Sequence, residues 1–442
     1  MRPNIVFILA DDLGYADLGC YGARADVSPN LDRLARDGLR CLNSYSNSPV
    51  CSPTRFALMS GRYQYRFAGG AEEPLTFSRE HLDPNLGFPP THPSLPSLLR
   101  RQGYRTALIG KWHLGSPPGS GPLSCGYEEH FGTLGGGVDY FSHRTLGGPK
   151  DLWDNGRPAT SEGYLTDLFS ERACDYVERM ANASAPFFLS LHYTAPHWPW
   201  QAREDRAESD RIGNRIQHTD GGSVETYQRM VRQMDEGIGR LIRTLERHVM
   251  LRNTLIVFTS DNGGERYSDS WPLIGGKMDL TEGGIRVPCI VHWPERVAAA
   301  GVSSQLVTTM DWTATLLEAA GAQADPQFPL DGMSMMRMLE DPAWNAPRWL
   351  FWQMKYRDQA AARYGNWKYL AIASHEYLFD LARDSRERAN VRHRYPDRFE
   401  QLRQAFLDWQ QTMPPRPPTA SYSLVATDED MPHWHRLDEG GH

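Results

Sequence analysis

Short apolar runs alternate with longer amphipathic stretches along roughly the first 345 residues. The apolar runs have the length of buried strands and cover residues 5–10, 106–109, 187–192, 255–260 and 287–292. Between them apolar side chains recur at helical spacing, and the longest such stretch is 224–247. Long helical connections suit parallel neighbouring strands. The pattern therefore predicts an α/β fold with a large mixed, mostly parallel sheet that is flanked by helices.

The pattern changes near residue 345. Short aromatic, strand-like segments then occur at 349–352, 367–370 and 377–379, and one helical pattern covers 399–411. This predicts a small C-terminal α+β unit, an antiparallel sheet with one packed helix. The proline-rich run that begins at Pro414 cannot continue the helix. We therefore predict a large domain over 1–345, a C-terminal subdomain over 346–413 and an extended tail over 414–442.

The charge balance argues against nucleic acid as a partner. The chain has 54 acidic and 47 basic residues, a formal net charge of −7, and no block of Lys and Arg. No apolar run approaches the roughly 20 residues that cross a bilayer, so no membrane association is expected. The run at 5–10 leads into two aspartates without a cleavage site, so we interpret it as a strand and expect a cytoplasmic protein. The six cysteines are scattered without a CxxC pair, which argues against a zinc cluster and a disulfide framework.

Polar side chains directly follow four of the predicted strands. They are Asp11 and Asp12 after the first, Lys111 and His113 after the second, His197 after the third, and Asp261 and Asn262 after the fourth. The carboxyl ends of parallel strands share one sheet edge, where doubly wound folds bind their ligands. A single aspartate there is often only a turn former, but four such sets indicate a functional site. His192 lies inside the third run, and we interpret it as a structural residue.

Three carboxylates and an amide carbonyl form an oxygen-only ligand set. Such a set suits Ca²⁺ or Mg²⁺ rather than zinc, whose sites favour His and Cys. Additional positive charge or hydrogen-bond donors would come from Arg55, Lys111, Lys277, His113 and His197. A site of this kind fits a doubly charged tetrahedral oxyanion, so sulfate or phosphate esters are the predicted substrate class.

Cys51 stands at the start of a predicted helix, with Pro53 in its first turn. A helix N-terminus lowers the pKa of a thiol, and Arg55, one turn along, faces the same side. From these residues alone the expectation is a reactive cysteine beside an arginine. The alternative is a buried cysteine at a helix cap.

The motif Cys51-x-Pro53-x-Arg55, followed by Ser60-Gly61-Arg62, resembles the signature of the type I sulfatases, a family of the alkaline phosphatase superfamily. Further resembling segments are residues 4–14, 110–115, 259–263, 276–277 and 282–288, so the resemblance covers essentially the whole chain. It implies an alkaline-phosphatase-like sheet with a smaller C-terminal domain. It also implies a sulfuric ester hydrolase of the arylsulfatase type.

The resemblance further implies that Cys51 is a precursor. A separate formylglycine-generating enzyme would oxidise it to formylglycine (3-oxoalanine), an aldehyde that hydrates to a geminal diol. One hydroxyl of the diol could take the sulfuryl group, and elimination through the other hydroxyl would then expel sulfate. Covalent catalysis would thereby be divided into two accessible steps.

The same resemblance assigns roles by position. The implied metal ligands are Asp11, Asp12, Asp261 and Asn262, with an oxygen of modified Cys51. Ca²⁺ is the expected ion, with Mg²⁺ and Mn²⁺ as lesser alternatives. The remaining implied roles are orientation of the diol by Arg55, sulfate binding by Lys111 and Lys277, assistance to the leaving alcohol by Lys277 or His197, and general-base catalysis by His113.

Several alternatives stay open. The enzyme could be a carbohydrate sulfatase, or a formylglycine-dependent phosphonate monoester or phosphodiester hydrolase. A two-zinc phosphatase is disfavoured because its sites require several histidine ligands, and a sulfatase-like binding protein is disfavoured because every expected catalytic position is filled. Residues 135–144 are a candidate wall of the substrate pocket, and Trp198 and Trp200 either stack on a substrate ring or pack ordinarily. Aryl sulfate is the proposed test substrate, and no oligomeric state is predicted.

Overall fold

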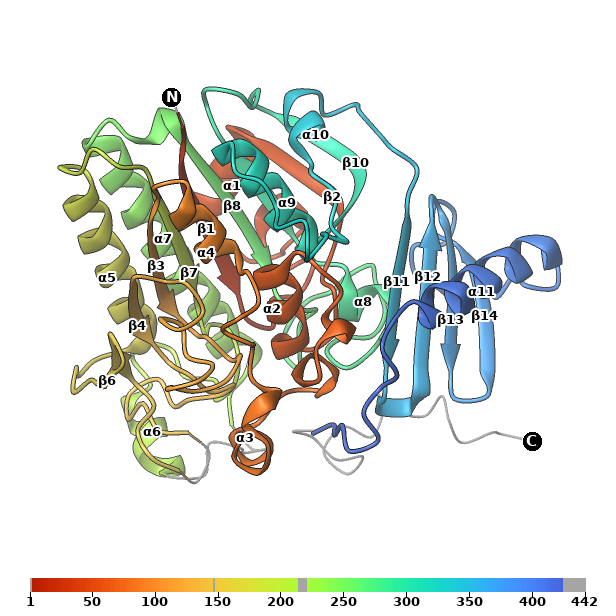
Figure 1. Ribbon diagram of the computed structural model, residues 1–442, viewed down its shortest axis with the longest axis horizontal. Coiled ribbons are helices and arrows are strands. Elements are labelled where there is room, and N and C mark those ends of the chain that lie inside the picture. The colour runs from red at the N-terminus through yellow and green to blue at the C-terminus, as the bar shows by residue number, and fades with distance from the viewer. Residues whose placement is uncertain (1, 146–147, 214–220, 424–442) are drawn as a thin grey trace.

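The computed structural model describes residues 2–145, 148–213 and 221–423, and a ten-stranded sheet runs through its larger part (Figure 1). The strand order is β10-β2-β9-β8-β1-β7-β3-β4-β5-β6. The strands are β1 (Asn4–Ala10), β2 (Leu39–Tyr45), β3 (Arg105–Gly110), β4 (Glu129–Gly132), β5 (Trp153–Asp154), β6 (Arg157–Pro158), β7 (Phe187–His192), β8 (Thr254–Ser260), β9 (Cys289–His292) and β10 (Gly301–Thr308).

The central strands β8, β1, β7, β3 and β4 are parallel to one another, and β2 and β10 form a second parallel pair. Strand β9 is antiparallel to both β8 and β2, and the short strands β5 and β6 add an antiparallel edge. The prediction of a mixed, mostly parallel sheet is therefore confirmed.

Helices cover both faces of this sheet. The α-helices are α1 (Pro29–Arg36), α2 (Cys51–Ser60), α3 (Phe77–Leu82), α4 (Leu95–Arg101), α5 (Leu165–Met180), α6 (Arg206–Ile212), α7 (Val224–Arg247), α8 (Glu282–Ile285), α9 (Thr309–Ala320), α10 (Met336–Glu340) and α11 (Pro396–Gln411). Short 3₁₀ helices are η1 (Gly19–Tyr21), η2 (Gln64–Arg66), η3 (Gly69–Ala71), η4 (Pro84–Leu86), η5 (Leu251–Asn253) and η6 (Tyr356–Asp358). The observed bounds of α7 are those that the apolar spacing predicts.

Strand β1 shows why the predicted strands are apolar without interruption. Val6 and Ile8 belong to the core beneath α1, α5 and α7, whereas Ile5, Phe7 and Leu9 belong to the core beneath α2, α4 and α9. Alternate side chains of a strand point to opposite faces of the sheet. A strand that is covered by helices on both faces therefore needs apolar side chains at successive positions. In Figure 1 α5 and α7 lie together on the left, and α2, α4 and α9 lie nearer the centre.

A second, smaller sheet lies at the C-terminal side (Figure 1, right). It is antiparallel and consists of β11 (Trp349–Met354), β12 (Gln359–Tyr364), β13 (Trp367–Ile372) and β14 (His375–Asp380). One face packs on α11 through side chains that include Tyr369 and Phe406. The other face packs on the large part of the molecule. The predicted antiparallel sheet with one helix is confirmed, with β12 as a strand that the sequence reasoning missed.

The described part of the tail does not run free over the surface. The backbone of Glu73 donates to Ser421 O at 2.9 Å and accepts from the backbone N–H of Ser423 at 2.9 Å. The described part of the tail thus pairs with the segment that precedes α3. Residues 424–442 of the predicted tail lie outside the described residues.

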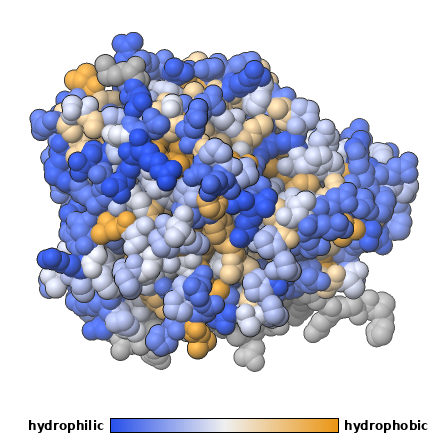
Figure 2. Space-filling view, viewed as in Figure 1, coloured by the Kyte–Doolittle hydropathy of each residue, from blue (hydrophilic) through white to orange (hydrophobic). Residues whose placement is uncertain are grey.

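Among the described residues, no helix combines the length and apolarity that a bilayer crossing requires. Figure 2 shows a mostly hydrophilic face, on which hydrophobic residues form small separate patches.

Candidate active site

Four neighbouring parallel strands bring the polar residues to one edge of the large sheet. The order β8-β1-β7-β3 places the ends of these strands side by side. Asp261 and Asn262 follow β8, Asp11 and Asp12 follow β1, His197 follows β7, and Lys111 and His113 follow β3. All seven side chains are buried. The parallel register, with Ala10 opposite Ser260 and Gly110 opposite His192, is what aligns these ends.

Cys51 joins this group from a different direction. It is the first residue of α2, its side chain is 2% exposed, and its sulfur lies within 4.8 Å of carboxylate oxygens of Asp11 and Asp261. The helix continues through Arg55, four residues on, which places both side chains on the same face.

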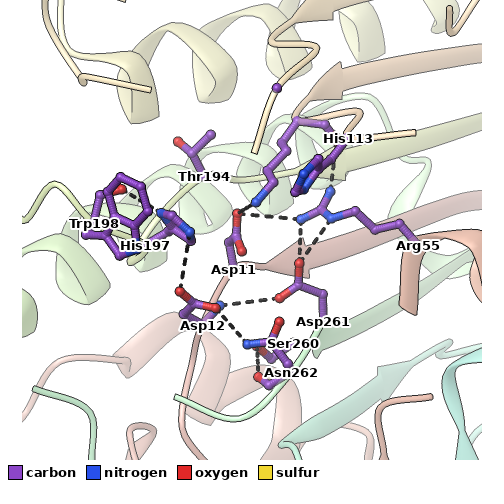
Figure 3. A network of polar contacts seen from close by, with 12 residues as sticks. Asp11, Asp12, Arg55, His113, Thr194, His197, Trp198, Ser260, Asp261 and Asn262 are labelled. Atoms are coloured by element: carbon purple, nitrogen blue, oxygen red, sulfur yellow. Dashed lines mark hydrogen bonds and ion pairs between the residues drawn. The ribbon is translucent and has the colours of Figure 1, made fainter. Parts of the chain in front are cut away.

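Arg55 anchors one of the carboxylates. Its Nε and Nη2 donate to Asp261 Oδ2 at 3.0 and 2.8 Å, and its Nη1 donates to the backbone oxygen of Lys111 at 2.8 Å (Figure 3). The planar fork of a guanidinium suits this paired arrangement. Arg55 Nη2 also lies 3.7 Å from Asp11 Oδ2. The observed partners of Arg55 are thus two carboxylates and a backbone carbonyl, and its expected role in orienting the diol stays a prediction.

Two lysines bind the remaining carboxylates. Lys111 Nζ lies 2.5 Å from Asp11 Oδ2, and Lys277 Nζ lies 2.7 Å from Asp12 Oδ2. Each ammonium group has three donors, so these contacts leave further donors for the oxygens of a bound anion.

The pKa values of Asp12 and Asp261 are shifted in opposite directions. Burial opposes ionisation of Asp12, but Lys277 and His197 outweigh it and lower the pKa of Asp12 to about 2. Burial and the repulsion of Asp11 raise the pKa of Asp261 to about 6, against the opposing effect of Arg55. Of these two carboxylates, Asp12 therefore holds its negative charge more firmly.

The pKa of Cys51 differs from the expectation. Burial raises the pKa of this thiol above its ordinary value, although Lys111 and Lys277 act in the opposite direction. The prediction of a lowered pKa at the helix N-terminus was wrong because it did not include the loss of solvation around the sulfur. The thiol of unmodified Cys51 is a poor nucleophile in this structure.

His113 is placed as a neutral base. Its Nε2 lies 2.7 Å from Leu75 O, and since a carbonyl can only accept, Nε2 carries the proton. Burial, with Lys111 and Arg55, holds the pKa of His113 well below its usual range. Its Nδ1 has no hydrogen-bond partner within the described parts of the chain, so this nitrogen offers a free lone pair.

His197 has a similar tautomer. Its Nδ1 lies 2.5 Å from Trp198 O, which leaves Nε2 as the basic nitrogen, 3.6 Å from Asp12 Oδ2. Burial and Lys277 lower the pKa of His197 to about 3. A neutral Nε2 and a carboxylate both accept, so a hydrogen-bond donor or a cation would be stabilised between them.

The glycines of residues 135–137 lie against both histidines. A Cβ on Gly136 would sit 2.5 Å from the ring of His113, and one on Gly137 would sit 3.1 Å from Trp198 and 3.4 Å from His197. Side chains are thus excluded here for steric reasons. This part of the candidate wall, residues 135–144, does border the site.

The two tryptophans differ in their settings. The Trp198 ring is partly buried, with its centroid 4.6 Å from that of His197. Trp200 is buried, with Arg266 over one face and Tyr267 edge-on, which is ordinary packing. His192 is also structural, as predicted, because it is buried inside β7 with Phe7 edge-on.

The sequence reasoning missed three supporting residues. Ser260 Oγ accepts from the backbone N–H of Leu13 and donates to Asn262 O, which fixes the turn after β8. Glu265, whose pKa is raised by burial to about 7 although Lys277 lowers it, lies on the loop beyond Asn262. Leu75 holds His113 through its backbone. Ser260 and Glu265 lie next to the predicted Asp261-Asn262 motif, which could have pointed to them. No sequence signal points to the backbone carbonyl of Leu75, which is 38 residues away from His113.

The residues present fit a hard metal ion. Asp11 Oδ1 and Asn262 Oδ1 are buried and have no hydrogen-bond partner among the described residues. Buried oxygens without partners are costly unless a ligand satisfies them. The carboxylates of Asp11, Asp12 and Asp261 together with the Asn262 amide oxygen provide the oxygen-only set that such an ion prefers.

Comparison with known proteins agrees with this geometry. The sulfatase family model matches residues 3–322, and the model described as N-sulphoglucosamine sulphohydrolase, C-terminal, matches residues 276–411. Human N-acetylgalactosamine-6-sulfatase is 34% identical over 357 residues, which are 76% of this chain and 66% of that protein. Mouse arylsulfatase J is 32% identical over 350 residues, 77% of this chain and 56% of that protein.

A solved structure is similar over almost its full length. The crystal structure of Ps i-CgsB in complex with k-i-k-neocarrahexaose superposes with a TM-score of 0.84 at 32% identity, and the alignment covers 96% of each chain. Both sheets and the packed C-terminal helix match the sulfatase fold. The chain belongs to the sulfatase family. It spans a little less than two thirds of the length of the curated relatives it matches.

The raised pKa and burial of Cys51 predict slow alkylation. In protein with unmodified Cys51, we expect iodoacetamide to react with this thiol at neutral pH far more slowly in the folded state than in urea, because burial suppresses the thiolate. The rate should increase only as pH rises beyond the ordinary thiol range. Mass spectrometry of the Cys51 peptide measures the rate of alkylation, and the half-buried Cys174 serves as an internal reference. Equal rates in the folded and unfolded states would contradict the prediction.

Proposed function

We propose that this protein hydrolyses sulfate monoesters of carbohydrates. The observation that carries the proposal is the convergence of Cys51 with the three carboxylates and with Lys111 and Lys277 at one buried sheet edge. The membership of the chain in the sulfatase family supports the reaction class. Two names support a sugar sulfate as substrate. The human relative is named N-acetylgalactosamine-6-sulfatase, and the structure of Ps i-CgsB was solved with k-i-k-neocarrahexaose.

The nucleophile is proposed to come from oxidation of Cys51 to formylglycine by a separate enzyme. As the raised pKa of its thiol makes unmodified Cys51 a weak nucleophile, the site has a chemical reason to use an oxygen nucleophile instead. The residues Cys51, Pro53 and Arg55 match the family's motif for this conversion. The hydrated aldehyde would supply the hydroxyl that attacks sulfur.

The proposed ion is Ca²⁺, held by Asp11, Asp12, Asp261 and Asn262 with an oxygen of modified Cys51. Bound there, it would act as a Lewis acid for sulfate oxygens and the nucleophile. The oxygen-only ligand set supports Ca²⁺ over zinc, and Mg²⁺ and Mn²⁺ are the alternatives that the experiment must separate.

The protein side chains divide the remaining work. Lys111 and Lys277 have donors left for sulfate oxygens, which would stabilise the charge of the transferring group. His113, neutral and with Nδ1 free of partners, is proposed to remove the proton of the second hydroxyl. His197 or Lys277 is proposed to assist the departure of the alcohol. The burial of these groups keeps bulk water from the reacting centre.

Relative rates on four substrate classes test the assignment. A sulfated oligosaccharide, an aryl sulfate, a phosphonate monoester and a phosphodiester are compared with matured enzyme. We expect kcat/KM to be highest for the sulfated sugar and measurable for the aryl sulfate. A higher value for the phosphonate or the phosphodiester would overturn the sulfatase proposal, whereas a preference for aryl sulfate would overturn only the carbohydrate substrate.

We predict that removal of the Cys51 thiol causes complete loss of activity. We expect Cys51→Ala to abolish sulfate ester hydrolysis because no other residue of the site can become formylglycine. The melting temperature should change little, since only one sulfur atom is removed. The matched control is Cys174→Ala on α5, away from the site, which should retain turnover. Hydrolysis by the Cys51→Ala protein at the parent rate would refute this nucleophile.

We predict that metal binding raises the melting temperature of the protein. Ca²⁺ at 100 times its Kd should stabilise the folded protein by about 2.7 kcal/mol, measured as a rise in melting temperature. Asp261→Asn should reduce that rise because one carboxylate ligand is lost, and Asp154→Asn, in a pair with Arg172 away from the site, should not. A larger shift with Mg²⁺ or Mn²⁺ than with Ca²⁺ would show that the ion is assigned wrongly.

A further inference from the structure

The segment that follows Lys277 is held in an unusual conformation. Met278 is buried and has φ of 74°, a left-handed value that side chains other than glycine rarely adopt. Its backbone N–H donates to Pro49 O at 3.0 Å, just before Cys51, and the N–H of Lys277 donates to Gly264 O at 3.0 Å. A strained backbone of this kind persists only where surrounding contacts determine it.

Gln359 of the small sheet provides two of these contacts. Its Nε2 donates to Met278 O at 2.8 Å, and its Oε1 accepts from the N–H of Leu280 at 2.9 Å. The side chain is 1% exposed. One amide group from the first residue of β12 therefore fixes the backbone on both sides of Asp279.

A buried charge cluster holds the end of the same segment. Lys368 on β13 lies 3.0 Å from Glu282 Oε1 and 2.8 Å from Glu387 Oε1, and its side chain is fully buried. The backbone N–H of Glu282 donates to Glu387 Oε2 at 2.6 Å, and Tyr45 Oη donates to Glu282 Oε2 at 2.6 Å. The small sheet thus contributes the cation nearest to two buried carboxylates beside α8, while Arg286 and Arg363 lie 3.4 and 3.6 Å from Glu282 Oε2.

Apolar packing connects the same parts. Met278, Leu280 and Cys51 share one buried cluster with side chains of β11 and β13, among them Trp352 and Leu370. The inner face of the small sheet is therefore part of the core that surrounds the proposed nucleophile and the Lys277 segment.

We propose that Gln359 and Lys368 are positioning residues for Lys277, so that the C-terminal sheet completes the active site without touching substrate. The inference rests on the proposed function, since it assigns the cause of Lys277's placement in that reaction. Lys277 has a long flexible stem, and its ammonium group reaches Asp12 only if its backbone is fixed. Gln359 and Lys368 fix it from the two sides of residues 278–282.

Gln359 is the better position for a test. Removal of Lys368 would take the nearest cation away from two buried carboxylates, which destabilises the fold. Gln359 is neutral, and Gln359→Leu introduces an apolar side chain of similar size. It removes the hydrogen bonds to Met278 O and the Leu280 N–H, together with one to Tyr356 O at 3.1 Å. Gln353 on β11 offers a matched control, because it is a buried glutamine of the same sheet whose Oε1 accepts from Gln410 of α11.

We expect Gln359→Leu to lower kcat/KM for a sulfate ester by roughly 10- to 100-fold, because small displacements of a catalytic group have effects of that size. Gln353→Leu should leave kcat/KM unchanged. A decrease of the same size in both variants would overturn the proposal, since it would indicate a general defect of the sheet. An unchanged kcat/KM in Gln359→Leu would overturn it as well.

A double-mutant cycle separates positioning from loss of stability. In a Lys277→Ala background, Gln359→Leu should have no further effect on kcat/KM, because the group it positions is absent. A second decrease of equal size would show that Gln359 acts independently of Lys277 and would refute the inference.

Hydrogen exchange gives a readout that does not depend on activity. Amides of residues 278–282 should exchange faster in Gln359→Leu and at the parent rate in Gln353→Leu. Unchanged exchange in Gln359→Leu would count against the proposal even if kcat/KM fell. If the parent protein hydrolyses no sulfate ester while exchange changes as expected, the proposed function fails and the structural role of Gln359 stands.

Discussion

The structure depends on the neutralisation of three buried carboxylates that lie close together. Asp11, Asp12 and Asp261 follow adjacent strands, and like charges at such distances repel strongly in a medium of low polarity. The nearest cations to Asp11, Asp12 and Asp261 are Lys111, Lys277 and Arg55 respectively, and Arg55 also lies 3.7 Å from Asp11. Removal of one cation would leave a buried charge uncompensated, which costs far more than the loss of an exposed pair.

This need for three cations explains why distant parts of the chain must meet. The carboxylates are supplied by the sheet, but Arg55 comes from a helix and Lys277 from a loop that needs support from the second sheet. The parallel sheet brings the three carboxylates and one of the cations, Lys111, to the same edge, but the other two cations come from outside it. The small C-terminal sheet therefore belongs to the chemistry of the site as much as to its stability.

The sequence predicts those parts of the structure that are governed by local rules. The continuous apolar strands and the helix Val224–Arg247 follow from periodicity, and the shared edge of parallel strands follows from topology. Strand β12, with the sequence QAAARY, has few β-branched or aromatic residues and was missed, and with it the role of Gln359. The predicted direction of the pKa shift of Cys51 was wrong because the burial of a side chain depends on the tertiary structure. Contacts between residues about 80 positions apart leave no local signal.

The burial of Cys51 has a consequence for the order of events during synthesis. The proposed maturation enzyme would have to reach a thiol that, in the finished fold, is 2% exposed and shares a core with Trp352 and Leu370. These residues emerge from the ribosome some 300 positions after Cys51. The proposed oxidation would therefore belong to the interval before the last strands dock, and rapid folding would compete with complete maturation. A variant that folds faster would then carry less formylglycine.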